Sequence, residues 1–217
     1  MRINQIAPNF TSQTTHGEIN FHDWSKGSWT LFFSHPKDFT PVCTTEIGSF
    51  AKYEKDFSKR KCKLIGLSVD SLESHISWIK DVEEVQGEKV NFPIVADENL
   101  HVSKLYNMLP EDTEPGSGRT PQQNATVRSV LIIDPDLNIK LILTYPMTTG
   151  RNILELLRVL DSLQLTSKYK VATPVNWESG QKVIIVPAVS NDEAKELFDD
   201  DWDTVKPYLR FINQPKN

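Results

Sequence analysis

The residues best suited to chemistry surround Cys43, a cysteine at the junction of a strand and a helix. Residues 29–34 form a short β-favouring run, and Pro36 ends it because proline removes a ladder donor. Thr40 is a good N-cap, and Pro41 suits the first helical position. The spacing therefore predicts a helix that begins near residue 41 and carries the cysteine in its first turn.

The stretch after Cys43 has the pattern of an amphipathic helix. Its apolar residues recur at helical spacing at Ile47, Phe50, Ala51 and Phe57, whereas the lysines fall largely on other faces. Unpaired N–H groups and the dipole at a helix N-terminus stabilise an anion, and cysteines there can have pKa values of about 3.5–7.5 instead of about 8.5. The position predicts a nucleophilic thiolate, whereas a lone cysteine without this context is more often inert and buried.

The sequence around Cys43 resembles the peroxidatic motif of the peroxiredoxins. Pro36, Thr40 and Cys43 stand in the pattern Pro-x-x-x-Thr-x-x-Cys. Residues 33–46, Phe-Ser-His-Pro-Lys-Asp-Phe-Thr-Pro-Val-Cys-Thr-Thr-Glu, are similar to the one-cysteine peroxiredoxin-6 subfamily. The resemblance covers essentially the whole chain. It implies a thiol-dependent peroxidase that reduces hydrogen peroxide and organic or lipid hydroperoxides through a Cys43 sulfenic acid.

The resemblance also implies roles for residues near the cysteine. Attack of a thiolate on a peroxide leaves negative charge on the departing oxygen, and a fixed cation stabilises that charge. The arginine that has this role in the family matches Arg128. Thr40 would bond the thiolate or the peroxide oxygen, and Pro36 would shield the sulfur from water. The positions expected to support the thiol and the arginine are His35, Glu46 and Arg151.

Strand and helix signals alternate along the first part of the chain and predict an α/β fold, in which a closing hairpin indicates a thioredoxin-like layer structure. Asp70 is the expected N-cap of the second long helix, with Glu73 completing a capping box. The other predicted elements are an N-terminal hairpin at 10–21, strands at 63–69 and 92–96, helices at 70–86, 99–108 and 152–165, a loop at 109–125, and a hairpin of 127–133 with 139–145.

The character of the sequence changes after Leu165. The segment that follows holds a strand-like run at 182–189 and an acidic run at 199–201. It resembles the C-terminal extension of the same subfamily, a small β-containing module. We therefore expect a thioredoxin-like peroxiredoxin domain over residues 1–165 and a C-terminal peroxiredoxin extension over residues 166–217.

Composition and charge argue against several classes of partner. The 24 lysines and arginines and the 29 aspartates and glutamates give a net charge of -5, which argues against nucleic acid as a partner. No segment approaches the roughly 18 apolar residues of a membrane span, so no span is predicted. The start of the chain lacks the apolar stretch of a signal peptide, so we expect a cytoplasmic location.

Cysteine and histidine usage gives no indication of a metal or cofactor. Two cysteines in 217 residues are too few for a disulfide scaffold, and no C-x-x-C is present. The five histidines, at positions 16, 22, 35, 75 and 101, lack ligand spacing such as H-x-x-x-H. No glycine loop suited to phosphate is found either. We expect neither a metal site nor a bound cofactor.

The second cysteine, Cys62, is not expected to form a disulfide with Cys43. It lies 19 positions further on (62 minus 43), so a helix with a rise of about 1.5 Å per residue would separate the sulfurs by roughly 25 Å. A disulfide needs Cα atoms about 4.4–6.8 Å apart. We therefore predict that Cys62 has a packing role and that an external reductant, namely glutathione, a thioredoxin-like protein or ascorbate, completes the cycle. The resemblance also implies a homodimer.

Two other functions compete with peroxide reduction. Members of the subfamily are associated with a phospholipase A2 activity, and the matching positions here are Ser28, His22 and Asp136. That signal is weak, because Lys26-Gly-Ser-Trp-Thr lacks both glycines of the G-x-S-x-G pattern. A non-catalytic binding or chaperone role, with Cys43 as a structural residue, is the third reading.

Overall fold

The structure is a computed structural model, and it describes residues 1–110, 124–199 and 201–215. The chain divides into two compact units, Met1–Ile153 and Leu154–Asn217, which we describe separately. Most of the loop predicted at 109–125 lies outside the described residues.

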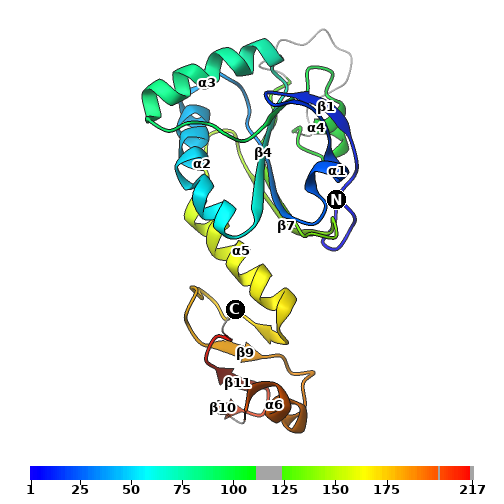
Figure 1. Cartoon of the computed structure of the whole chain (residues 1–217), viewed down its shortest axis with the longest axis vertical. Coiled ribbons are helices and arrows are strands. Elements are labelled where there is room, and N and C mark those ends of the chain that lie inside the picture. The colour runs from blue at the N-terminus through cyan, green and yellow to red at the C-terminus, as the bar shows by residue number, and fades with distance from the viewer. Residues whose placement is uncertain (111–123, 200, 216–217) are drawn as a thin grey trace. The chain divides into compact units, whose positions relative to one another are not determined.

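A seven-stranded mixed sheet forms the centre of the first unit, with the strand order β2-β1-β5-β4-β3-β6-β7 (Figure 1). The central strand β3 runs parallel to β4 and antiparallel to β6. All six of its residues are buried, as expected of an apolar run with both faces covered. The strands are β1 Thr11–Thr14, β2 Gly17–Asn20, β3 Trp29–Ser34, β4 Cys62–Ser68, β5 Ile94–Ala96, β6 Arg128–Ile133 and β7 Ile139–Tyr145.

Helices cover both faces of this sheet. They are α1 Phe21–Ser25, α2 Pro41–Lys59, α3 Leu72–Gln86 and α4 His101–Leu105. Figure 1 shows α2 and α3 on one face and α1 and α4 on the other. The two long helices approach each other closely at Gly48, where an added Cβ would lie 2.6 Å from the Cβ of Gln86. The absence of a side chain at this position lets α3 pack directly against the helix that carries the cysteine.

Two neighbouring aromatic residues of β3 contribute to the core on opposite faces of the sheet. They do so because successive side chains of a strand point to opposite faces. Phe32 packs with Phe21 and Tyr106 on the side of α1 and α4. Phe33 stacks on Phe50 of α2 with ring centroids 4.0 Å apart. Strand β3 is therefore held from both sides, which fixes the loop that leaves its end.

The N-cap predicted for α3 is wrong by one residue. The cap is Ser71, whose hydroxyl accepts a hydrogen bond from the backbone N–H of Ser74. Asp70 is diverted because its carboxylate accepts hydrogen bonds from the Ser68 hydroxyl and from the backbone N–H of Asp38. The aspartate thereby joins the end of β4 to the loop that precedes α2.

The second unit contains most of helix α5 (Ile153–Lys168) and a four-stranded antiparallel sheet in the order β10-β11-β9-β8. Its strands are β8 Val171–Ala172, β9 Val183–Ile185, β10 Trp202–Lys206 and β11 Leu209–Ile212. Helix α6 (Asn191–Phe198) was not predicted, although Ser190 and Glu193 have capping-box spacing and the Ser190 hydroxyl caps the helix. Trp177 is buried in the core of this unit.

The predicted fold class is confirmed: the chain is an α/β protein with an N-terminal hairpin and a small β-containing C-terminal module. Across the part of the chain that the structure describes, no helix combines the length and the apolar character needed to cross a membrane.

Candidate active site

Cys43 is the third residue of α2 and is fully buried. Thr40 occupies the N-cap position with an extended backbone, as predicted, but its side chain makes no capping hydrogen bond. The Thr40 hydroxyl instead donates to the carbonyl of Lys37 at 2.8 Å, closing the turn before the helix. Its carbonyl accepts the first helical hydrogen bond, from the N–H of Thr44. The Thr40 hydroxyl proton is therefore not directed at Cys43, three residues further on, and only the oxygen of this hydroxyl is left to accept a hydrogen bond.

Arg128 lies against Cys43 from the first residue of β6. Its Nη1 is 3.4 Å from the Cys43 Sγ and 2.6 Å from Oε2 of Glu46. Its Nε and Nη2 both donate to the carbonyl of Met147, at 2.9 and 2.6 Å. Only 3% of the arginine is exposed, so its charge acts on the sulfur through a medium that screens it far less than water.

Glu46 follows Cys43 by three positions, on the same side of α2, and its carboxylate binds two arginines. Arg151 donates to it from its backbone N–H and Nε, both 2.8 Å from Oε1, and from Nη2, 2.7 Å from Oε2. Burial by itself raises the pKa of Glu46, but the charge and hydrogen bonds of Arg151, with the charge of Arg128, hold that pKa below its ordinary value. The carboxylate therefore stays ionised between two cations.

Arg151 also ties this carboxylate to the sheet. Its Nη1 donates to the carbonyls of Ser34 at the end of β3 and Ser129 near the start of β6, at 2.8 and 3.1 Å. Its guanidinium lies over the ring of Phe33, with Cζ 5.1 Å from the ring centroid. The two arginines and Glu46 thus connect the first turns of α2 to the neighbouring ends of two central strands.

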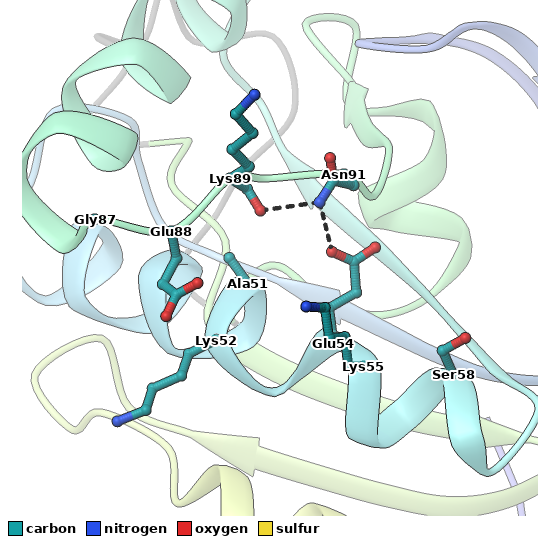
Figure 2. Close-up of a pocket in the computed structure, with 9 residues that line it drawn as sticks. All are labelled: Ala51, Lys52, Glu54, Lys55, Ser58, Gly87, Glu88, Lys89 and Asn91. Carbon is teal, nitrogen blue, oxygen red and sulfur yellow. Dashed lines mark hydrogen bonds between the residues drawn. The ribbon is translucent and has the colours of Figure 1, made fainter.

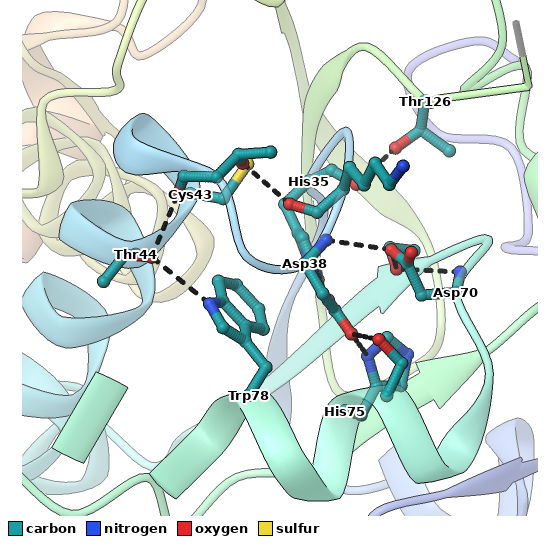
Figure 3. Close-up of polar contacts among 12 residues, drawn as sticks. His35, Asp38, Cys43, Thr44, Asp70, His75, Trp78 and Thr126 are labelled. Atoms are coloured by element: carbon teal, nitrogen blue, oxygen red, sulfur yellow. Dashed lines mark hydrogen bonds and ion pairs between the residues drawn. The ribbon is translucent and has the colours of Figure 1, made fainter. Parts of the chain in front are cut away.

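A second buried polar network, which the sequence analysis did not predict, lies before α2. Asp38 has one carboxylate oxygen 2.8 Å from Nε2 of His35 and the other 2.7 Å from Nδ1 of His75 (Figure 3). Ser74 donates to the second oxygen at 2.8 Å. Burial raises the pKa of Asp38, but the hydrogen bonds and charges of the two histidines outweigh that effect and hold it well below its ordinary value.

His35, Asp38 and His75 also offer the ligand types of a metal site, which histidine spacing alone did not indicate. Their nitrogen to oxygen separations of 2.7 and 2.8 Å are lengths of charge-assisted hydrogen bonds. The geometry is therefore that of a hydrogen-bonded network. His35 contacts Asp38 and lies against the ring of Trp78, at a centroid distance of 5.0 Å.

Phe39 separates Asp38 from Thr40 and has an unusual backbone. Its φ is +54°, in the left-handed region, and 54% of the residue is exposed. This conformation costs a non-glycine residue roughly 1–2 kcal/mol, so the contacts on either side must supply the compensation.

Pro36, two residues before Asp38, is buried just beyond the end of β3.

Cys62 is the first residue of β4 and is buried, and both cysteines are free thiols. Burial raises the pKa of the Cys62 thiol to about 12, with a small opposing effect of a hydrogen bond to the backbone of Leu31. Cys62 therefore remains a protonated thiol near neutral pH. Its position in the central sheet agrees with the packing role predicted for it.

A large surface pocket lies away from this chemistry. It has a volume of about 610 Å³ and is bounded by the C-terminal half of α2 and the segment after α3 (Figure 2). Glu54 accepts a hydrogen bond from Asn91 across it. The lining is mixed in charge and includes neither Cys43 nor the residues that contact it. It consists of Ala51, Lys52, Glu54, Lys55, Ser58, Gly87, Glu88, Lys89 and Asn91.

The residues weighed for acyl hydrolysis do not form a catalytic triad. The backbone N–H of Gly27 donates to the carbonyl of Pro135, so the segments of Ser28 and Asp136 adjoin. The His22 Nε2, however, is 2.7 Å from the carbonyl of Ala7. Among the described residues, no hydrogen bond joins the Ser28 hydroxyl to His22. A nucleophile and its base must be within hydrogen-bond reach, so the geometry does not favour this activity.

Comparison with known proteins agrees with the motif around Cys43. Residues 3–142 match the AhpC/TSA family, and residues 162–200 match the C-terminal domain of 1-Cys peroxiredoxin. The mitochondrial peroxiredoxin PRX1 of Saccharomyces cerevisiae is 53% identical over 97% of this chain and 80% of that protein. Peroxiredoxin-6 of Gallus gallus is 47% identical over 97% of this chain and 96% of that protein.

Solved structures show the same agreement. A variant of the peroxiredoxin 6 of Arenicola marina has a TM-score of 0.91 and 43% identity, covering 100% of both chains. The yeast mitochondrial 1-Cys peroxiredoxin, described in terms of thiol resolution via glutathione/thioredoxin systems, has a TM-score of 0.89 and 50% identity, covering 98% of this chain and 99% of that chain.

These relatives correct one prediction. A cytoplasmic location is contradicted by the similarity to the mitochondrial peroxiredoxin of yeast. The prediction rested on the lack of an apolar signal peptide, but mitochondrial transit peptides are amphipathic and rich in arginine, so that observation does not distinguish the two compartments. The family prediction, in contrast, is confirmed, and with it the thiol peroxidase activity: the chain belongs to the AhpC/TSA family of peroxiredoxins, in its one-cysteine, peroxiredoxin-6 branch.

Proposed function

We propose that Cys43 is the peroxidatic residue of this thiol peroxidase and that Arg128 is its catalytic cation. The Cys43 thiolate attacks one peroxide oxygen; an S–O bond forms, the O–O bond breaks, and the second oxygen leaves as hydroxide or alkoxide and takes a proton from solvent. The sulfur is oxidised to sulfenic acid. The observation that carries the proposal is the 3.4 Å contact between Arg128 Nη1 and Cys43 Sγ, which places a cation where negative charge moves.

Thr40 would orient the peroxide. Its hydroxyl proton is committed to the carbonyl of Lys37, so its oxygen is suited to accept a hydrogen bond from the peroxide O–H. Pro36, buried in the same loop, would keep water from the sulfur. The remaining residues act through others: Glu46 and Arg151 hold Arg128 in place, and His35 supports the loop through Asp38.

The second half of the cycle requires an external thiol. The solved yeast relative is described as resolved via glutathione/thioredoxin systems. We extend this to the present chain, with glutathione or a thioredoxin-like protein as the reductant and a mitochondrial location. The raised pKa of Cys62 supports the external route, because a protonated buried thiol attacks a sulfenic acid poorly.

The domain division we propose is a peroxiredoxin domain over residues 1–165 and an extension over residues 166–217. The match to the 1-Cys C-terminal domain from residue 162 supports it, although the division into compact units falls between residues 153 and 154.

We also propose a homodimer. Beyond Ile139, strand β7 pairs within the described residues only with β6, and such an open edge favours pairing with a second copy.

Replacement of Arg128 tests the catalytic assignment. Arg128→Ala should lower the second-order rate constant for hydrogen peroxide by about 10²–10³-fold, the usual effect of removing one group that stabilises developing negative charge. Stopped-flow kinetics on the parent, Arg128→Ala and Cys43→Ser would measure it. Arg158→Ala, which changes an arginine of the second unit, is the matched control. A parent-like rate in Arg128→Ala would contradict the assignment.

The one-cysteine mechanism predicts where oxidation accumulates. Excess peroxide should add oxygens to Cys43, first as sulfenic and then as sulfinic acid, because no resolving thiol of the same chain competes. Peptide mass spectrometry should find Cys62 unmodified, and Cys62→Ser should turn over at the parent rate with an external thiol. A Cys43–Cys62 disulfide in high yield, or oxygens on Cys62 alone, would refute this mechanism.

Sedimentation velocity tests the dimer. A monomer has a mass of 24.8 kDa, and we expect a species of about twice that mass at micromolar concentration. Leu143→Lys places a charge on the open β7 edge and should shift the protein towards monomer. Glu18→Lys on β2, the opposite edge strand, is the control and should leave the mass unchanged. A parent protein that sediments only as monomer would exclude the dimer.

A further inference from the structure

We propose that Asp38, held by Ser74 and His75 of α3, is a positioning residue for peroxide reduction. By this assignment, which rests on the proposed function of Cys43, the anchored aspartate keeps the strained Phe39 in its left-handed conformation. The strained residue in turn sets the place of Thr40 and the first turn of α2.

The polar groups of Asp38 are almost completely engaged. Its backbone N–H donates to the Asp70 carboxylate at 2.9 Å, and its own carboxylate receives His35 on one oxygen and Ser74 with His75 on the other. Figure 3 shows these contacts converging on the aspartate from separate segments of the chain. A residue held from this many directions cannot rotate without leaving several buried polar groups unpaired.

His75 is the member of this network that joins it to the rest of the fold. Its Nδ1 faces the Asp38 carboxylate at 2.7 Å and its Nε2 faces the carbonyl of Val95 in β5 at 3.2 Å. Carboxylate and carbonyl oxygens are both acceptors, so whichever ring nitrogen carries a proton has an acceptor to donate to. The anchor therefore runs from the sheet through α3 to the loop and does not depend on α2.

Phe39 supplies the reason that an anchor is needed. Its φ of +54° is unfavourable for a side chain with a Cβ, and more than half of the residue is exposed, so packing of the ring does not explain the conformation. The neighbouring residues are fixed instead: Asp38 by its network, and Thr40 by its hydrogen bond to Lys37. Release of Asp38 would let Phe39 relax to negative φ and would carry the Thr40 hydroxyl away from the cysteine.

Helix α3 contacts the same region at a second point. Trp78, one turn after His75, donates from its Nε1 to the Thr44 hydroxyl at 3.2 Å, and that hydroxyl donates to the carbonyl of Thr40 at 2.9 Å. The Trp78 ring also lies 5.0 Å from the ring of His35. One face of α3 thus supports both the loop and the N-terminal turn of α2, and Trp78 can report on that arrangement.

The test compares the rate constants of Cys43 with hydrogen peroxide and with iodoacetamide. Alkylation needs the thiolate but not an oriented peroxide. His75→Ala should therefore lower the peroxide rate constant by about 10–100-fold, the usual effect of a small misplacement, and change alkylation much less. Val82→Ala removes side-chain bulk from the buried face of the same helix without touching Asp38 and should keep the parent ratio of the two rates.

Rescue by glycine separates positioning from a general loss of structure. Adding Phe39→Gly to His75→Ala should restore part of the peroxide rate, because glycine adopts positive φ without strain. Adding Phe39→Ala removes the ring but keeps a Cβ, so it should restore nothing. If His75→Ala does not fold, Asp38→Asn, which keeps the shape of the side chain, replaces it. The two rate constants are then compared for Asp38→Asn alone and with Phe39→Gly or Phe39→Ala added.

Two results would overturn the proposal. One is a parent-like peroxide rate in both His75→Ala and Asp38→Asn. The other is equal recovery with glycine and alanine at position 39. If the parent protein reacted with hydrogen peroxide no faster than Cys43→Ser, the proposed function itself would be wrong. The positioning role of Asp38 would then be wrong as well.

Discussion

The site depends on one buried carboxylate between two buried arginines. Glu46 is 4% exposed, and its oxygens accept hydrogen bonds from both Arg128 and Arg151. Without it, two cations would lie close together at one end of the sheet. Removing one partner of a buried ion pair typically costs about 3–5 kcal/mol, because the other charge is left uncompensated. The Glu46 carboxylate therefore stabilises the first unit and also holds Arg128 in contact with Cys43.

This arrangement fixes how the site responds to acid. The pKa of Glu46 in the folded protein lies below its ordinary value. The stabilisation is therefore fully present at pH values above the ordinary pKa of a glutamate, and it is lost as the pH falls through the lower pKa of the folded state. Asp38 behaves in the same direction. Both networks that support Cys43 are consequently intact near neutral pH, where a peroxidase must hold its cation and its loop in place.

The sequence alone predicted the parts of the site that depend on local pattern. Thr40 and Pro41 marked the start of α2, and the apolar runs marked β3 and β4. The pairing of His75 with Asp38 could not be read in this way, because the two residues are 37 positions apart and meet only when α3 packs against the loop that precedes α2. The cap at Ser71 was missed for a related reason, since a tertiary contact occupies Asp70.

A double-mutant cycle between Glu46 and Arg128 tests the central claim most directly. If Glu46 acts on catalysis by holding Arg128, then Glu46→Gln should slow the reaction of Cys43 with peroxide, and the double variant Glu46→Gln with Arg128→Ala should be about as slow as Arg128→Ala alone. The measurement is the second-order rate constant with hydrogen peroxide for the four proteins. Effects that simply multiply, or a parent-like rate in Glu46→Gln, would contradict the account.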